Sequence, residues 1–206
     1  GISVAASFDY VIVNNATIDN GRWGIVASGG VGPSEVDVAM SRYFVVQNNI
    51  CRGNAVGGIT IDPSTREDQE TPTGVIHDSF ATIASNVCVG NHGRGIQTMH
   101  AGYVTVHGNV CDNNDHIRDD DNDSSDGIGI VSSRFAMVAD NVLTANRYGV
   151  AILGDPTAVP PGTPQPDMGH HLIGGNVYDR NRASFPIQIA PNHPPVRQLH
   201  DQWPNG

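Results

Sequence analysis

The chain has 206 residues and a formal net charge of −10, with 11 Arg and no Lys against 18 Asp and 3 Glu. This length predicts a single domain over residues 1–206. A strongly acidic surface argues against nucleic acid as a partner, and it disfavours a bare polyanionic glycan unless metal ions bridge the charges. Since no apolar run approaches the length of a membrane span, no membrane-spanning segment is expected.

A frame of Asn, four residues and a second Asn returns along the whole chain. Of the 18 Asn residues, 12 form six such pairs. Ile or Val stands three residues before each pair, and most copies carry Gly plus a branched apolar residue shortly after it. The pairs are Asn15/Asn20, Asn49/Asn54, Asn86/Asn91, Asn109/Asn114, Asn141/Asn146 and Asn176/Asn181. An internal repeat of this kind indicates a solenoid.

The repeat predicts a parallel β-helix. A unit of two or three short strands cannot bury its apolar positions alone, whereas units stacked about 4.8 Å apart bury one continuous column. Asn tolerates positive φ, so we expect it at the sharp corners, with stacked side chains hydrogen-bonded along the column. Alternation such as Tyr103-Val104-Thr105-Val106 indicates strand. We therefore predict an all-β parallel β-helix of about six coils with loop insertions.

The first coils are expected in the N-terminal half. Coil one runs from Tyr10 to about Gly30 and is followed by a short insertion. Coil two ends on Ile59-Thr60-Ile61-Asp62 and leads into a polar segment, Pro63 to Ser79. Coil three, Phe80 to His100, passes directly into coil four at Tyr103. The coils begin at about residue 8, with no segment to cover the end of the solenoid, so we expect an additional domain or subunit there.

The second half carries its insertions at other places. Coil four contains the acidic segment 115–126. Coil five, Phe135 to Leu153, opens into a Pro-rich segment, 154–169. Coil six runs from His170 to Ala190, and residues 191–206 are expected to form a C-terminal cap or tail.

The frame Asn-x-Ile/Val/Cys-x-x-Asn, followed by Gly-Ile or Gly-Val, resembles the right-handed parallel β-helix repeat of the pectin-lyase-like superfamily. The resemblance covers roughly residues 8 to 190 and implies a right-handed single-stranded β-helix. The superfamily includes polysaccharide lyases, pectin-type glycosidases, mannuronan epimerases, phage tailspikes and NosD-type periplasmic proteins. It therefore implies a polysaccharide partner and an extracellular, cell-surface or virion location, and it leaves the activity open.

A groove is predicted over coils three and four. Long segments leave the same edge of the solenoid after coils two and five, whereas coils three and four have almost nothing there. Two walls would thus flank a trough roughly 10–15 Å wide. Grooves on solenoids suit extended polymers, and function concentrates on loops held by a rigid scaffold.

Candidate catalytic residues lie on the predicted strand of coil three. His100 is expected at the loop edge and Arg94 at the preceding corner, with Gln97 pointing outward. A His/Arg pair could act as base and charge neutraliser in β-elimination beside a uronate, or as an acid/base pair in epimerisation. The competing interpretation is that Arg94 and His100 are solvated corner residues. The predicted substrate-binding residues are Gln97, His92, Arg134 and Asp62.

The acidic run in coil four is the candidate metal site. Asp119, Asp121 and Asp123 alternate and could gather oxygens around Ca²⁺. The spacing is not that of an EF-hand, since Ser124 stands where the sharp-turn Gly belongs. The competing interpretation is a solvated loop without a cofactor.

Paired carboxylates provide a hydrolytic alternative. Asp126 with Asp112 or Asp119 could hydrolyse a glycosidic bond at a suitable separation, so Asp119 and Asp126 join the catalytic candidates. The epimerase motif Asp-Pro-His-Glu is missing, because Asp62-Pro63 continues with Ser64-Thr65. Lyase, glycosidase and uronate epimerase activity all stay open. The alternative is a non-catalytic glycan-binding or structural solenoid, such as a segment of a phage tailspike or surface fibre.

Two further columns follow from the repeat. Cys51, Cys88 and Cys111 occupy one position and are expected to be buried thiols that pack as small hydrophobic side chains. The residue after the first Asn of each pair is also apolar, although it lies on the opposite strand face. An exposed apolar row would favour association, for instance as a homotrimer. We expect instead that the corner geometry turns both positions inward.

Overall fold

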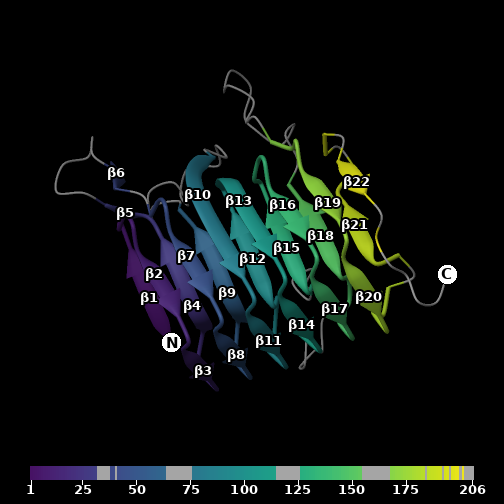
Figure 1. Ribbon diagram of the computed structural model, residues 1–206, viewed down its shortest axis with the longest axis horizontal. Helices are drawn as coiled ribbons and strands as arrows, with labels where there is room; N and C mark the ends of the chain where they lie inside the picture. Colours follow the sequence, from purple (N-terminus) through teal and green to yellow (C-terminus); the bar gives the residue numbers. More distant parts are fainter. Residues whose placement is uncertain are drawn as a thin grey trace.

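The structure is a computed structural model in which strands and turns make up the described residues, without any helix among them. Figure 1 shows the strands lying side by side along the long axis of the molecule, from the N-terminus to the C-terminus. The residues described are 1–31, 38–39, 41–63, 76–114, 126–154, 168–183, 185–191, 193–194, 196–199 and 201.

Three parallel sheets run along the molecule, here called sheets I, II and III. Sheet I contains β1 (Ile2–Ala5), β4 (Trp23–Ser28), β9 (Gly57–Asp62), β12 (Ile96–Met99), β15 (Ile128–Val131), β18 (Val150–Leu153) and β21 (Ile187–Ile189). Sheet II contains β2 (Val11–Val13), β7 (Val45–Gln47), β10 (His77–Ala84), β13 (Ala101–His107), β16 (Met137–Ala139), β19 (Leu172–Gly174) and β22 (Arg197–Leu199).

Sheet III has six strands, one from each coil. They are β3 (Ala16–Ile18), β8 (Ile50–Arg52), β11 (Val87–Val89), β14 (Val110–Asp112), β17 (Val142–Thr144) and β20 (Val177–Asp179). A small antiparallel pair, β5 (Gly30–Val31) and β6 (Val38–Ala39), lies outside the three sheets.

Each coil takes one strand from sheet II, one from sheet III and one from sheet I, in that order. Six coils are complete, from β2-β3-β4 to β19-β20-β21. β1 adds one strand before coil one, and β22 adds one strand after coil six. The predicted right-handed parallel β-helix of about six coils is confirmed.

The core is a set of columns in which the same inward position of successive coils stacks in register. Ile25 pairs with Ile59, Ile59 with Ile96, and Ile96 with Ile128, and all four are fully buried. The predicted thiol column is present: Cys51, Cys88 and Cys111 are free and buried. The hydrogen bond with Cys88, together with burial, raises the pKa of the Cys51 thiol, so this thiol stays protonated and packs as a small hydrophobic side chain.

The paired asparagines align in two columns that link the coils. The Asn86 Oδ1 accepts hydrogen bonds from the backbone N–H of Asn49 (2.9 Å) and from its Nδ2 (3.0 Å). The Asn86 Nδ2 in turn donates to the Val46 carbonyl (2.9 Å) and to Asn109 Oδ1 (3.0 Å). The second column repeats this pattern, for instance from Asn54 to Asn91. Buried amides thus satisfy one another and the corner backbone.

The bends themselves fall one residue earlier than expected. Positive φ occurs at the residue before each column Asn, for example at Asn48 (55°) before Asn49 and at Ser85 (55°) before Asn86. The column Asn residues are not among the residues with positive φ. The reason is that their backbone N–H groups donate along the column, which keeps them aligned with the next coil.

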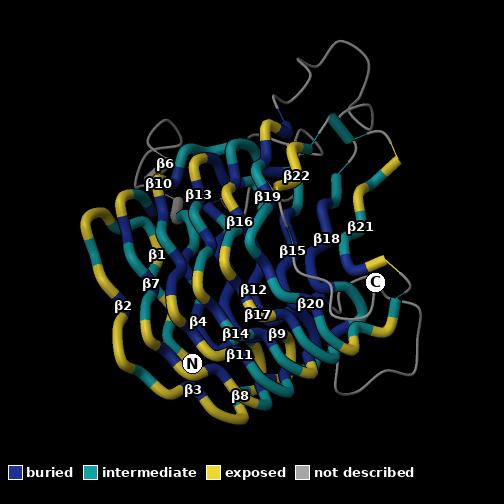
Figure 2. The backbone as a smooth tube through the Cα atoms, turned by 45° about the vertical axis from the view of Figure 1, so that its right-hand side comes forward, coloured by how far each residue is buried: buried dark blue, intermediate teal, exposed yellow. Residues whose placement is uncertain are grey.

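The outward direction of the apolar row on sheet III corrects the expectation that it turns inward. Ile50 is 47% exposed, whereas its neighbour Cys51 is fully buried. Three-residue strands alternate exposed, buried and exposed, and the bends come only after them. Figure 2 shows exposed positions on β3 and β8. The row consists of Ala16, Ile50, Val87, Val110, Val142 and Val177.

Both ends of the solenoid carry a strand that has no Asn pair. β1 pairs with β4, so the described structure begins before Phe8, where the first coil was expected. At the other end, β22 pairs with β19, and Asp201 follows it. The Asp201 Oδ1 accepts from the backbone N–H (3.0 Å) and the Nδ2 (3.3 Å) of Asn176, so a carboxylate continues the first Asn column.

Candidate functional site

A pocket of about 540 Å³ lies on the outer face of sheet I, over β4, β9 and β12. Strand alternation puts its residues there: Ile59 and Ile61 point into the core, so Thr60 and Asp62 point outward. Register places Thr60 beside Gln97. The pocket, called here the sheet I pocket, is lined by Gly1, Ile2, Ser3, Arg22, Trp23, Val26, Ser28, Thr60, Asp62, Gln97 and Met99.

Trp23 forms an apolar wall of this pocket. Its ring lies over Gly57 of the next coil, where an added Cβ would stand 2.2 Å from the ring atom Cζ3. Glycine is therefore required at position 57 for the close approach of the indole to the backbone. A flat aromatic wall beside polar groups is a common feature of ligand pockets.

A buried ion pair lies beside the pocket. Arg94 Nε and Asp126 Oδ2 are 3.0 Å apart, and their side chains are only 9% and 1% exposed. The Arg94 side chain crosses Gly129, where an added Cβ would stand 2.4 Å from its Cδ. Burial of such a pair requires good geometry, because both charges lose their hydration.

Hydrogen bonds extend from this ion pair into the pocket. Arg94 donates through a terminal nitrogen to Gln97 Oε1 (2.6 Å). Gln97 Nε2 then donates to Thr60 Oγ1 (3.4 Å). Asp126, Arg94, Gln97 and Thr60 therefore form one polar chain that runs across three coils of sheet I.

A second pair lies at the edge of the same face. His100 Nδ1 is 3.6 Å from Asp62 Oδ1, and both side chains are partly exposed. His100 has φ of +50° at the bend that follows Met99. The separation is too long for a hydrogen bond, but it places the carboxylate close enough to interact with the imidazole electrostatically.

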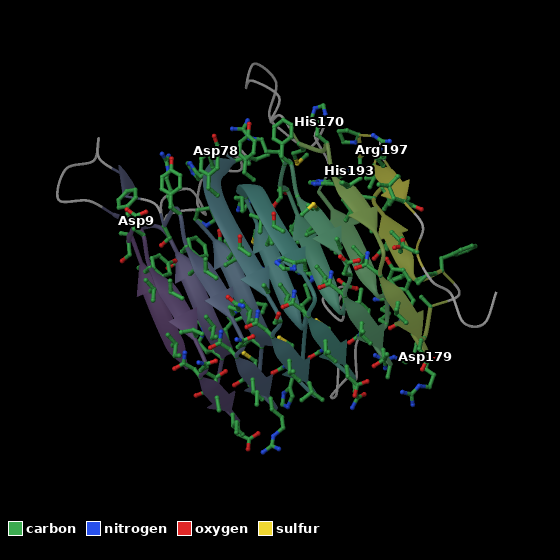
Figure 3. All side chains as sticks on the ribbon, in the orientation of Figure 1. Asp9, Asp78, His170, Asp179, His193 and Arg197 are labelled. Atoms are coloured by element: carbon green, nitrogen blue, oxygen red, sulfur yellow. The ribbon has the colours of Figure 1, made fainter. Side chains whose placement is uncertain are left out.

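Arg134 and His92 lie away from the pocket lining. Arg134 bonds Asp78 Oδ1 through Nε (3.2 Å) and a terminal nitrogen (2.7 Å), packed against Gly102 at the edge between sheets I and II. Figure 3 shows Asp78 at the upper edge of the molecule. His92 follows the second Asn column, and its backbone N–H donates to the Asn54 carbonyl (3.0 Å).

The structure thus brings together five of the predicted site residues. Arg94, Gln97 and Asp126 form one cluster, and Asp62 and His100 form a pair on the same face. One reading of these residues is wrong, because Arg94 is a buried residue and not a solvated corner residue. Asp112 lies on sheet III and accepts a hydrogen bond from Thr144, whereas Asp126 pairs with Arg94 beside sheet I, so the pairing of Asp112 with Asp126 stays a prediction.

Asp119, Asp121 and Asp123 lie outside the described residues, so their catalytic and calcium roles stay predictions. Among the residues that the structure describes, no group of three or more His, Cys, Asp or Glu side chains is arranged to hold a metal ion. The described part of the chain also has no helix long and apolar enough to cross a membrane.

The two predicted walls, within residues 64–75 and 155–167, also lie outside the described residues. The trough over coils three and four therefore stays a prediction, and the pocket reported above lies over coils one to three.

Sequence reasoning missed Trp23, Thr60 and Met99 as pocket residues. A signal for one of them was present in the repeat. Most coils carry a glycine at the start of the sheet I strand, for example Gly24 and Gly58. The residue immediately before this glycine lies on the outer face of sheet I, and its type differs from coil to coil. Aligned on that position, Trp23, Gly57, Arg94, Asp126 and Tyr148 fall in one row.

Comparison with solved structures gives strong matches of low sequence identity. The A-module of the mannuronan C-5 epimerase AlgE4 of Azotobacter vinelandii matches with a TM-score of 0.67 at 15% identity, covering 98% of this chain and 53% of that one. The periplasmic alginate epimerase AlgG matches with a TM-score of 0.57 at 15% identity, covering 98% and 46%. The chain shares the fold of these β-helix epimerases.

This likeness concerns the fold, and the β-helix spans about half the length of these two structures. No family model matches the sequence, and no curated protein matches it. The fold alone leaves the activity open, because function depends on the residues on the surface of the β-helix.

Proposed function

We propose that this β-helix binds an extended polysaccharide along the outer face of sheet I and modifies it chemically. The observation that carries the proposal is the outer face of sheet I, where the sheet I pocket with its Trp23 wall lies beside the Arg94–Asp126 pair and the His100–Asp62 pair. The two structural neighbours are described as epimerases of mannuronan and alginate, which supports a polysaccharide as substrate.

Each group has a role in this proposal. Trp23 offers an apolar surface to a sugar ring, and the amide of Gln97 with the Thr60 hydroxyl offers hydrogen bonds to sugar hydroxyls. His100, whose Nδ1 lies 3.6 Å from Asp62 Oδ1, transfers the proton during the reaction. Arg94, held by Asp126, fixes the orientation of the Gln97 amide through its bond to Oε1.

The test is an activity assay across a panel of neutral and acidic glycans. New reducing ends report hydrolysis, absorbance at about 235 nm reports an unsaturated product, and proton NMR of the sugar reports epimerisation. We expect His100→Ala to lower the rate roughly 100-fold or more, since general acid–base catalysis contributes at least that much.

His107→Ala is the matched control, because His107 lies on β13 in sheet II and takes no part in the pocket. Equal rates for His100→Ala and the unsubstituted protein on every substrate that turns over would show that His100 is not the proton-transfer group.

A second candidate is a non-catalytic glycan-binding or structural solenoid, such as a tailspike or surface-fibre segment. The sequence after Asp62-Pro63 favours it, because Ser64-Thr65 stand where the epimerase motif has His-Glu. Glycan binding without any product, unchanged by His100→Ala, would establish this second function.

The location and partners belong to the same proposal. An extracellular, cell-surface or virion location suits a polysaccharide substrate, and AlgG is described as periplasmic. A homotrimer, or a further domain over the N-terminal end, would cover surface that the described residues leave exposed. Immunodetection in medium, envelope and cytoplasm fractions of the producing cells tests the location.

A further inference from the structure

We infer that the sheet I pocket selects an uncharged polysaccharide and discriminates against polyuronates. This inference rests on the proposed glycan site and narrows its substrate class. It separates this β-helix from the two structural neighbours, which are described as acting on mannuronan and alginate.

Arg94, the buried cation that bonds the pocket residue Gln97, is already paired with a carboxylate of the protein. Arg94 lies 3.0 Å from Asp126 and donates to Gln97 at 2.6 Å, and its side chain is almost completely buried. A uronate carboxylate would have to displace the Asp126 carboxylate to reach this guanidinium. Breaking a buried pair leaves a charge without its partner, which is strongly unfavourable.

The groups that line the pocket suit hydroxyls better than carboxylates. Thr60, Ser28 and Gln97 are neutral hydrogen-bonding groups, and Trp23 is apolar. Asp62 lines the pocket as well and can accept a hydrogen bond from a sugar hydroxyl. A bound uronate would instead place a second negative charge beside Asp62.

Arg22 is the arginine that lines the pocket itself, and it is exposed. An exposed charge of this kind is screened by solvent and contributes little to holding a carboxylate. The pocket therefore offers a uronate no buried cation whose charge is not already compensated among the residues described.

The charge of the whole chain acts in the same direction. The net charge is −10, and there is no lysine. The two connections from sheet I to sheet II after β9 and β18 are acidic by composition: residues 64–75 hold three acidic residues and one arginine, and residues 155–167 hold two acidic residues and no cation. Such a field slows the approach of a polyanion, most strongly at low salt.

Selection of an uncharged polymer has a chemical consequence. Both β-elimination and C5 epimerisation remove a proton beside a carboxyl group, which a neutral sugar lacks. Among the reactions proposed above, hydrolysis is therefore the one compatible with this substrate class, with water adding across the glycosidic bond. The non-catalytic alternative is equally compatible.

The test is calorimetric titration with oligosaccharides that differ only in charge. The central pair is β-1,4-mannohexaose and β-1,4-hexamannuronate, which share linkage and configuration and differ at C6. Cellohexaose, xylohexaose and oligogalacturonate extend the panel, with each titration run in EDTA and repeated in calcium. We expect at least one neutral oligosaccharide to bind roughly tenfold more tightly than every uronate.

The outcomes separate the two proposals. A uronate that binds more tightly than the neutral oligosaccharides, with or without calcium, would overturn the inference and leave the glycan site standing. No binding by any glycan in the panel would overturn the proposed function and the inference together.

Neutralising the Asp126 carboxylate tests the role assigned to Arg94. Asp126→Asn keeps the shape of the pair and releases the charge of Arg94, so we expect hexamannuronate to bind roughly tenfold more tightly than to the unsubstituted protein. Asp112→Asn is the matched control, because Asp112 lies on sheet III, and it should leave every affinity unchanged.

A thermal melt establishes that each variant is folded. If Asp126→Asn unfolds, Asp62→Asn takes its place, because it removes a pocket carboxylate and leaves the Arg94 pair intact. A folded variant, Asp126→Asn or its replacement, that discriminates against hexamannuronate as strongly as the unsubstituted protein would overturn the inference.

Discussion

Sheets I and III each receive one strand from every coil, yet the residues on their outer faces differ in how far they repeat from coil to coil. On sheet III the row from Ala16 to Val177 repeats one residue class in every coil, and most of it is exposed. On sheet I the corresponding row changes from Trp23 to Gly57, Arg94 and Asp126, and most of it is partly or fully buried. The row that keeps one residue class in every coil belongs to the scaffold, and the row whose residue type changes from coil to coil forms the candidate site.

The contrast has an energetic side. An isolated valine on an exposed strand face has little influence on stability. A buried arginine and carboxylate lose hydration and are tolerated only as a pair. Stability at the sheet I face therefore depends on the pairing of buried charges, whereas stability at the sheet III face does not.

The largest expected effect concerns the columns on which both faces rest. Asn86→Ala removes the acceptor of Asn49 N–H and Nδ2 and the donor to Val46, all within the buried column. We expect the free energy of unfolding to fall by about 4 kcal/mol, because each buried unsatisfied group costs about 1–3 kcal/mol. Chemical denaturation measures it.

Asn15→Ala is the matched control, since Asn15 stands in coil one, donates to Asn49 and is partly exposed. It should lower the free energy of unfolding by only about 1 kcal/mol. Equal losses for both variants would mean that position along the column has no influence.

The ion pair provides the next effect and tests the buried character of the sheet I face. Arg94→Met leaves Asp126 buried without its partner, so we expect a loss of about 3 kcal/mol in the free energy of unfolding. Arg94→Met combined with Asp126→Leu should recover most of this loss.

The comparison face supplies the control for this variant. Arg52→Met, on exposed β8 of sheet III, should change the free energy of unfolding by less than about 0.5 kcal/mol. If Arg94→Met lowered the free energy of unfolding no more than Arg52→Met does, the proposed energetic difference between the two faces would be refuted.

A buried histidine makes the stability of the protein depend on pH, so the two faces are best compared above its pH window. His171 is 2% exposed, and its Nδ1 accepts a hydrogen bond from the Ala136 N–H (3.1 Å). Burial, reinforced by the neighbouring His193 and His170, lowers the pKa of His171 from 6.5 to about 3. The folded protein therefore binds fewer protons than the unfolded chain between these two values.

Stability from this group is present above pH 6.5 and is lost as the pH falls toward 3. The loss has a slope of at most about 1.4 kcal/mol per pH unit. We expect His171→Leu to reduce the pH dependence of the unfolding free energy by that slope in this window. An identical pH profile for the variant would show that His171 titrates normally.

The smallest expected effect on stability is on the sheet III row. Val87→Thr should change the free energy of unfolding by less than about 0.5 kcal/mol, because the side chain faces solvent.

Light scattering tests whether the same row joins copies of the chain. If the row joins three copies, the unsubstituted protein has the mass of a trimer and Val87→Asp has the mass of one chain; a monomeric unsubstituted protein would refute the trimer proposal.

Much of the fold follows from the repeat itself. The Asn pairs mark the two columns, and the apolar residue three positions before each pair, such as Val46 or Ile83, lies in the core as expected. β1 and β22 were not foreseen, because they carry no Asn pair and the repeat was the guide. The direction of the sheet III row was misjudged because the corner was expected to turn both Ile50 and Cys51 inward, whereas the bend comes only after the strand.

The site was predictable in its residues more than in its contacts. Arg94, Gln97 and His100 were recognised from one strand, where the alternation is legible. Arg94 and Asp126 are 32 residues apart, and the acidic insertion lies between them. The spacing of the Asn pairs does not show which residue after the insertion stacks on Arg94. Alignment of Gly95 with Gly127 does show it, because Arg94 and Asp126 each come directly before one of these glycines.

The head-to-tail order of the first Asn column gives the solenoid an electrical direction. From Asn15 to Asn176 each side-chain NH₂ donates one hydrogen bond to the side-chain oxygen of the next coil, and the carboxylate of Asp201 accepts the last of them. Aligned amide dipoles reinforce one another much as peptide dipoles do in an α-helix, so an anion belongs at this end. Any extra coil engineered after coil six must therefore present an acceptor oxygen where Asp201 now stands.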